Sequence, residues 1–187
     1  MNFNGSYKVI AEDLNIAPLL NKILATTDEQ WERNTYRQDR SEASADVLTI
    51  VLKLSDLSYN KTFVFNEWDE WQGVIEPVIY EVLHNFKNPF VNKCLLPKLK
   101  KGGCIIEHVD VSKTFSVSHR LHIPLVTNKD AIMTIGGEEK NMKVGTCYEV
   151  NNKLLHSVVN NGDSDRIHLL FDVYERTDEE QKMAEAQ

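Results

Sequence analysis

The chain has 187 residues, and its 28 acidic and 21 basic side chains give a formal net charge of −7. This length suits one domain that buries about 70% of its unfolded surface in a single core, without disulfides. The acidic balance disfavours a general nucleic-acid surface, and no apolar run approaches the ~20 residues of a membrane span. We therefore expect neither nucleic acid nor membrane as a partner.

The first half of the chain predicts helices and a strand. Apolar residues at three- and four-residue spacing predict an amphipathic helix near 13–26, and a β-branched run predicts a strand over 47–54. A second apolar stripe over 71–86 predicts another helix, in which Pro77 marks a kink or a late start. We interpret residues 1–90 as a supporting layer.

From about residue 91 the pattern changes to short β-rich segments separated by turns rich in glycine and asparagine. This pattern is typical of a β-sandwich or barrel, and closure into a jelly roll removes exposed strand edges. We expect one mainly β domain over 1–187, a cupin-like double-stranded β-helix with supporting helices. Residues 91–175 form its core, and 176–187 form a charged tail or short surface helix.

The cysteines and the first residues bear on where the protein resides. Cys94, Cys104 and Cys147 are odd in number and widely spaced, which suits neither a disulfide framework nor a cysteine zinc site. The chain starts without a basic stretch that leads into an apolar core. We expect reduced cysteines and a cytoplasmic protein.

The candidate metal site starts from a histidine and a carboxylate two residues apart. His108 and Asp110 follow the apolar run Cys104-Ile105-Ile106, so they lie on or just past a strand and point to the same face. Two histidines and one carboxylate on one face of a metal suit non-haem Fe(II), because the remaining positions stay open. His156, in a later β-like segment, is the best candidate for the third ligand.

Arg166 opens a strongly apolar run ten residues after His156. A buried arginine is costly unless it meets an anion, and its planar fork suits a bidentate carboxylate. The C5 carboxylate of 2-oxoglutarate would be such a partner. The alternative is an ordinary salt bridge in the turn, with Asp163 or Asp165.

The segment 102–174 resembles the aspartyl/asparaginyl β-hydroxylase family of Fe(II)- and 2-oxoglutarate-dependent oxygenases. The matching stretches, in order, are Gly-Gly-Cys-Ile-Ile-Glu-His-Val-Asp at 102–110, Arg-Leu-His-Ile-Pro-Leu at 120–125, Ile-Gly-Gly-Glu at 135–138, His156 with Asn160, and Asp165-Arg166 leading into Phe171-Asp172-Val173. A weaker match lies upstream, at Arg37 and the strand that follows it.

The resemblance implies a role for each matched residue. His108 and His156 correspond to the iron-binding histidines, and Arg166 to the arginine that binds the distal carboxylate of 2-oxoglutarate. Arg120 and His122 correspond to a pair near the metal-chelating end of that cosubstrate. For Arg120, a solvated position at a sheet edge is the alternative.

The chain departs from some family members at three points. Asp110 stands where the animal enzymes have glycine, so a full set of two histidines and one carboxylate is expected, which argues for hydroxylation and against halogenation. The serine that helps to hold the distal carboxylate in the animal enzymes has no clear counterpart near Pro97. The helical-repeat region of the animal proteins is also missing.

The function implied is that of a dioxygenase with Fe(II), 2-oxoglutarate and O2. It hydroxylates an amino-acid side chain, in a peptide or protein or in a free amino acid such as proline, and releases succinate and CO2. One alternative is a cupin-like metal enzyme without 2-oxoglutarate, which would have no use for Arg166. The other is a non-catalytic metal-binding jelly-roll module. The sequence leaves the oligomeric state open.

Several other polar and aromatic side chains receive structural interpretations. The histidines without an assigned role are His84, His119 and His168, although strand alternation puts the last of these on the face of Arg166. Core or helix packing is favoured over a substrate entrance for Phe65, Trp68 and Trp71. A solvated strand edge is expected for Lys98, Lys100 and Lys101.

Overall fold

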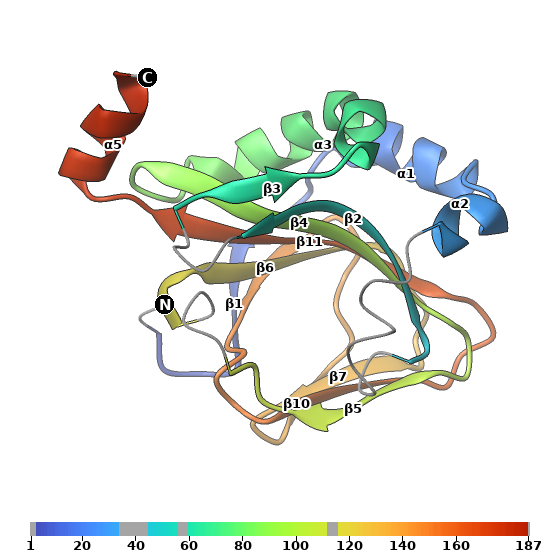
Figure 1. Cartoon of the computed structure of the whole chain (residues 1–187). Helices are drawn as coiled ribbons and strands as arrows, with labels where there is room; N and C mark the ends of the chain where they lie inside the picture. Colours follow the sequence, from blue (N-terminus) through green and yellow to red (C-terminus); the bar gives the residue numbers. More distant parts are fainter. Residues whose placement is uncertain (1–2, 34–44, 56–59, 112–115, 187) are drawn as a thin grey trace.

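The computed structural model describes residues 3–33, 45–55, 60–111 and 116–186, and its body is a pair of antiparallel β-sheets (Figure 1). The larger sheet has seven strands, in the spatial order β1 (Tyr7–Ala11), β9 (Cys147–Val150), β6 (His119–Val126), β11 (Arg166–Glu175), β4 (Pro89–Leu99), β2 (Val47–Ser55) and β3 (Thr62–Val64). The smaller sheet has four, in the order β5 (Cys104–His108), β10 (His156–Asn160), β7 (Ala131–Ile135) and β8 (Glu138–Lys140).

The two sheets face each other, and the chain passes between them repeatedly. Figure 1 shows β5, β7 and β10 on one side and β4, β6 and β11 on the other. Consecutive strands β4 and β5 lie in different sheets, as do β6 and β7, β9 and β10, and β10 and β11. This arrangement confirms the expected mainly β jelly roll.

Helices cover the outer face of the larger sheet (Figure 1). They are α1 (Ala17–Leu24), α2 (Asp28–Glu32) and α3 (Glu67–Leu83). The first lies within the helix predicted near 13–26, and β2 matches the strand predicted over 47–54. The second predicted helix begins earlier than its apolar stripe, because a first turn with the acidic residues Glu67, Asp69 and Glu70 precedes the stripe, and Pro77 lies inside the helix.

Successive side chains of β11 point to opposite faces of the larger sheet. Ile167, Leu169 and Phe171 belong to the main apolar core beneath the helices. Arg166 and Leu170, of the opposite parity, line a pocket between the sheets. The same central strand therefore anchors the helical layer and supplies side chains to the interior of the jelly roll.

The segment before residue 91 contributes more than a supporting layer. β1 pairs with β9, and β2 pairs with β4, so both are strands of the main sheet. The expected boundary at residue 90 thus falls within β4 and does not separate two sheets. The weakly matching Arg37 lies outside the described residues.

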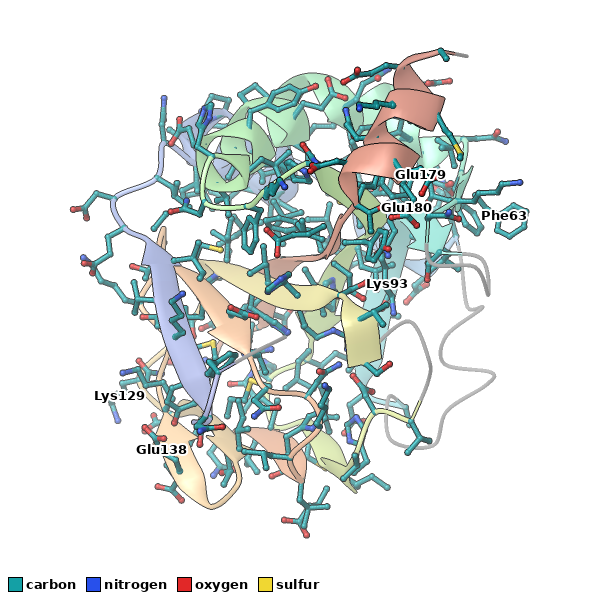
Figure 2. The ribbon with its side chains drawn as sticks, turned by 90° about the vertical axis from the view of Figure 1, so that its left-hand side faces the viewer. Phe63, Lys93, Lys129, Glu138, Glu179 and Glu180 are labelled. Atoms are coloured by element: carbon teal, nitrogen blue, oxygen red, sulfur yellow. The ribbon has the colours of Figure 1, made fainter. Side chains whose placement is uncertain are left out.

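The charged C-terminal segment forms the short surface helix α5 (Asp178–Glu185), which begins with a capping box between Thr177 and Glu180. Figure 2 labels Glu179 and Glu180 on this helix, at the opposite end of the molecule from Glu138 of the smaller sheet. The hydroxyl of Tyr174 donates to the carboxylate of Glu180, which joins the helix to the end of β11.

The expectation for Lys98 was wrong, because β4 is an interior strand. The side chain of Lys98 is buried. Its ammonium lies 3.4 Å from the carboxylate of Asp28 and over the ring of Trp31. Lys100 and Lys101 are exposed, as expected.

Other structural expectations hold in the described chain. Trp68 and Trp71 are buried in the main core, and the cysteines at 94, 104 and 147 are free. Of the helices in the described ranges, none is both long and apolar enough to span a membrane.

Candidate active site

Two antiparallel strands of the smaller sheet bring His108 and His156 together. The two residues are direct cross-strand partners, and their ring centroids lie 4.3 Å apart. Beyond this pair the next partners are Val158 and Ile105, so β5 carries one extra residue there. This bulge lets both Ile105 and His108 face the pocket, an arrangement that is common beside functional sites.

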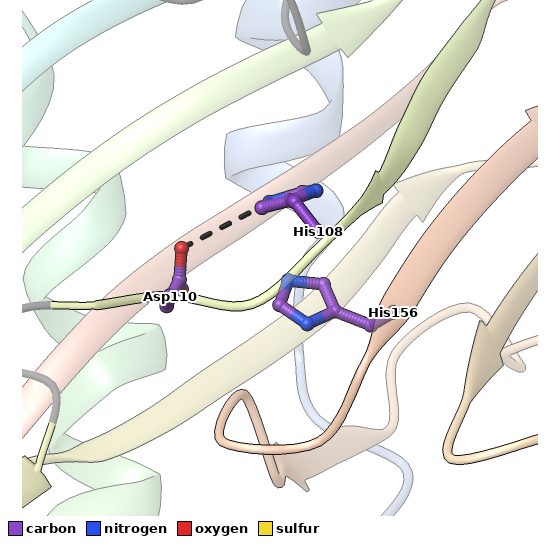
Figure 3. Close-up of side chains that lie close together, drawn as sticks. All are labelled: His108, Asp110 and His156. Carbon is purple, nitrogen blue, oxygen red and sulfur yellow. Dashed lines mark ion pairs between the residues drawn. The ribbon is translucent and has the colours of Figure 1, made fainter.

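Asp110 completes a cluster of three possible metal ligands just beyond the end of β5 (Figure 3). One ligand atom from each of His108, Asp110 and His156 lies within 4.8 Å of the others. Nε2 of His108 is 3.9 Å from Oδ1 of Asp110. The structure thus places together the three side chains that the sequence singled out.

Backbone carbonyls fix the tautomers of both histidines. Nδ1 of His108 lies 2.7 Å from the carbonyl of Ile106, and Nδ1 of His156 lies 2.9 Å from the carbonyl of Leu154. A carbonyl only accepts, so each Nδ1 carries the proton and each Nε2 keeps a lone pair. Metal-binding histidines are oriented by the same kind of contact.

Two side chains hold the same oxygen of the Asp110 carboxylate. Both Nη1 of Arg120 and Nδ2 of Asn152 donate to its Oδ2, at 2.5 and 3.1 Å. Burial alone would raise the pKa of Asp110, but the charge of Arg120 and the hydrogen bond from Asn152 outweigh burial and hold that pKa below its ordinary value. Asp110 is therefore an anion at neutral pH, and its Oδ1 is directed toward His108.

A pocket between the two sheets contains this cluster. It measures about 710 Å³ with its open mouth included. Its polar lining consists of His108, Asp110, Arg120, His122, Asn152, His156 and Arg166. The remaining wall is apolar and consists of Val47, Pro97, Leu99, Ile105, Met133, Val150, Val158 and Leu170. All six residues that the sequence assigned to a site line the same pocket.

Arg166 is a buried cation without a carboxylate partner in the described part of the chain. Only 5% of the residue is exposed, and burial lowers the pKa of its guanidinium to about 10. Asp165 instead accepts from the backbone N–H of Lys101. The alternative of a turn salt bridge to Asp163 or Asp165 was therefore wrong.

Two buried histidines lie beside Arg166. Nδ1 of His168 is 3.3 Å from Nη2 of Arg166, and the rings of His122 and His168 are 5.7 Å apart. Burial, followed by the charge of Arg166, lowers the pKa of each imidazole well below the ordinary value, so both are neutral. Nδ1 of His122 and Nε2 of His168 have no hydrogen-bond partner within the described ranges.

Arg120 is buried and paired, so its alternative placement at a solvated edge was wrong. It is 8% exposed and contacts the carboxylates of Asp110 and Asp172. The sequence analysis assigned no role to Asp172, Asn152 or His168. His168 and Asp172 carried a signal, their even spacing from Arg166 along one strand, whereas Asn152 reaches the site only through tertiary contacts.

A buried hydroxyl lies close to Pro97, where the sequence offered no counterpart of the family serine. Thr49 is the cross-strand partner of Pro97 and is 1% exposed. Its Oγ1 has no hydrogen-bond partner among the residues described. Because Thr49 has the parity of the pocket-lining Val47 on β2, it belongs to the pocket side of the sheet.

Solved structures with this fold include several oxygenases. A 2OG-Fe(II) oxygenase family oxidoreductase from Burkholderia pseudomallei is 12% identical with a TM-score of 0.57, and the alignment covers 89% of this chain and 93% of that one. A viral collagen prolyl hydroxylase from Paramecium bursaria Chlorella virus-1, solved with 2OG, is 12% identical with a TM-score of 0.53 and coverage of 91% and 96%.

A third similar structure is a prolyl hydroxylase from Trichoplax adhaerens in complex with a peptide fragment of the hypoxia inducible factor oxygen degradation domain. It is 8% identical with a TM-score of 0.58, over 95% of this chain and 86% of that one. At these identities the likeness shows a shared fold.

Sequence comparison identifies the family. No curated protein matches the chain. The family model described as aspartyl/asparaginyl beta-hydroxylase matches residues 15–176, which include both sheets from β2 onward and every pocket residue named above. The protein therefore belongs to the aspartyl/asparaginyl β-hydroxylase family and is an enzyme of the hydroxylase class.

Proposed function

We propose that this enzyme is an Fe(II)- and 2-oxoglutarate-dependent dioxygenase in which His108, Asp110 and His156 hold the iron. One observation carries the proposal. A single pocket contains a cluster of two imidazoles and a carboxylate together with Arg166, a buried cation that lacks a carboxylate partner among the described residues. The cluster suits a divalent metal ion, and the guanidinium of Arg166 suits one carboxylate of a dicarboxylic acid.

The three side chains fit Fe(II) in donor type and protonation. Two histidines and one carboxylate form the facial set of non-haem iron oxygenases, which leaves positions open for other ligands. Both imidazoles present Nε2 because Nδ1 is used by a carbonyl, and Asp110 is ionised. A metal needs donors in this form, with a free imidazole nitrogen and an ionised carboxylate.

The other end of 2-oxoglutarate fits Arg166. A guanidinium desolvated in an apolar wall gains most from a carboxylate that it can bind with two parallel hydrogen bonds. We assign the distal carboxylate to Arg166, with the free hydroxyl of Thr49 as a second donor. His122 and Arg120 then border the metal-chelating end, and His122 is neutral there, so it can donate without adding charge.

The bound iron, with 2-oxoglutarate and O2, supplies an oxidative decarboxylation that is coupled to hydroxylation of a C–H bond and yields succinate and CO2. The protein positions the cosubstrate and keeps water away from the reacting groups. Arg166 fixes one end of the cosubstrate, and the apolar wall around Ile105, Met133 and Val158 excludes water from the reacting groups.

We infer that the substrate is an amino-acid side chain, in a peptide or protein or in a free amino acid such as proline. The family name indicates aspartyl or asparaginyl residues, and the similar Trichoplax enzyme was solved with a peptide fragment. The free cysteines fit the reducing cytoplasm that we propose as its location.

Succinate release from 2-oxoglutarate with added Fe(II) and ascorbate tests the proposal. We expect His108→Ala to abolish turnover and to abolish Mn²⁺ binding, because a metal ligand is lost. His84→Ala is the matched control, since His84 is exposed at the C-terminal end of α3 and outside the pocket. Unchanged turnover in His108→Ala would refute the assignment.

A further inference from the structure

The guanidinium of Arg120 lies between two carboxylates, and only one of them belongs to the metal cluster. Asp172 is its direct partner across β11 and β6, and it accepts from Nε and Nη2 of Arg120, each at 3.0 Å. This is a bidentate pair, which fixes the plane of the guanidinium. The third nitrogen, Nη1, is thereby directed at Oδ2 of Asp110.

This fixed donor determines how Asp110 is oriented. Arg120 and Asn152 both use Oδ2, and Oδ1 is the oxygen that faces Nε2 of His108 at 3.9 Å. If the fork to Asp172 were lost, the guanidinium could turn toward Asp110 and engage both oxygens. The ligand atom and its orientation thus depend on Asp172.

Charge gives Asp172 a second effect. Asp110 carries one negative charge, Arg120 one positive charge and Asp172 one negative charge. These buried groups sum to −1, and without Asp172 they would sum to zero. A divalent cation is attracted to the first site and gains little from the second.

We propose that Asp172 is a positioning residue of the metal site, which fixes the guanidinium of Arg120 so that Oδ1 of Asp110 stays directed at the cluster, and which offsets the charge of Arg120 near a bound cation. This inference rests on the proposed function. Among the described residues, the hydrogen bonds and ion pair of Asp172 are with Arg120 and not with the metal cluster, so its effect passes through Arg120. Outer partners of this kind typically change metal affinity by about 10–100-fold when they are mutated.

The test measures the binding of Mn²⁺ alone, without 2-oxoglutarate, by titration calorimetry. We expect Asp172→Asn to weaken Mn²⁺ binding by about 10–100-fold. The double variant Arg120→Gln/Asp172→Asn restores the net charge of −1, and we expect it to recover most of the wild-type affinity. A role limited to packing predicts that the double variant binds no better than the single one.

Glu149→Gln is the matched control. Glu149 is also buried and also paired with a basic side chain, since its Oε1 is 2.6 Å from Nδ1 of His119. It lies on β9 next to the pocket-lining Val150 and so has the opposite parity. The same change of charge there should leave Mn²⁺ affinity unchanged.

The outcomes separate this inference from the proposed function. If the wild type binds no Mn²⁺, the proposed function fails. If the wild type binds and Asp172→Asn binds equally well, or if the double variant shows no recovery, the role of Asp172 is overturned. Should Asp172→Asn not fold, Arg120→Gln compared with the double variant decides, because Arg120→Gln keeps one more negative charge and must bind Mn²⁺ more tightly.

Discussion

At the scale of single residues, the two arginines of the pocket differ in what holds them. Burial disfavours the charge of both, but Asp172 and Asp110 raise the pKa of Arg120 above its ordinary value, whereas burial alone acts on Arg166 and lowers its pKa to about 10. Arg120 is thus satisfied within the protein. Arg166 has no carboxylate partner among the described residues, which supports the proposal that it contacts an anionic cosubstrate.

We expect Arg166→Ala to weaken 2-oxoglutarate binding to the Mn²⁺-loaded enzyme by at least about 30-fold, since truncating a buried partner of a charge pair costs roughly 2–5 kcal/mol. The affinity of Arg166→Lys for 2-oxoglutarate should fall between those of the wild type and Arg166→Ala, because lysine keeps the charge and loses the planar fork. Titration calorimetry measures each dissociation constant. Arg176→Ala is the control, since Arg176 packs over Phe90. Equal affinity in wild type and Arg166→Ala would contradict the assignment.

At the scale of elements, β11 and the β5–β10 pair do most to build the site. β11 alternates between the main core and the pocket, so Arg166, His168, Leu170 and Asp172 all share one face. The bulge in β5 adjusts the parity of that strand so that His108 meets His156. The helices contribute stability on the other side of the larger sheet.

Helix α3 contains Pro77 in its interior, and the residue is exposed. Proline cannot donate to the carbonyl four residues earlier, which belongs to Gly73. We expect Pro77→Ala to raise the free energy of unfolding by roughly 2 kcal/mol, the helix-interior cost of about 3 less about 1 of unfolded-chain entropy. Urea denaturation measures this change.

Gly73→Ala in the same helix is the reference for the stability change of Pro77→Ala. A Cβ there would meet nothing within 4 Å, so we expect a gain of about 0.5–1 kcal/mol from backbone entropy alone. A loss of stability in Pro77→Ala, together with a gain in Gly73→Ala, would show that the proline ring itself is required for packing.

At the scale of the whole molecule, the pocket places neutral histidines deep in the fold, and this makes stability depend on pH. The pKa values of His122 and His168 lie well below 6.5 in the folded protein because burial and the nearby charge of Arg166 oppose protonation. In the unfolded chain both titrate near 6.5. The stabilisation from keeping them neutral is therefore complete above that pH and is lost as the pH falls.

We expect the free energy of unfolding of the metal-free protein to decrease between pH 6.5 and pH 5.5, with a slope that approaches about 1.4 kcal/mol per pH unit for each of these two histidines. Urea denaturation at several pH values measures the slope. His168→Leu removes one of the two groups and should make the dependence shallower. A stability that is constant or rises over this range would contradict the account.

The sequence by itself predicted the jelly roll, the grouping of His108, Asp110 and His156, and a buried Arg166 in the same pocket. Strand alternation is a local rule, so it put His108 with Asp110 and Arg166 with His168 on shared faces before any partner was known. The same rule could not position Lys98, because the number of strands that flank β4 is a property of the whole sheet.

Only the tertiary structure decided what surrounds these side chains. Asn152 and Thr49 come from other segments and enter the site through pairings that no local pattern encodes, and the pairing of Asp172 with Arg120 depends on the register of β11 and β6. Whether a charge is satisfied likewise depends on distances across the fold, which is why Arg120 and Arg166 could be told apart only after folding. The physical reason is that periodicity fixes the direction of a side chain, while long-range pairing fixes its neighbours.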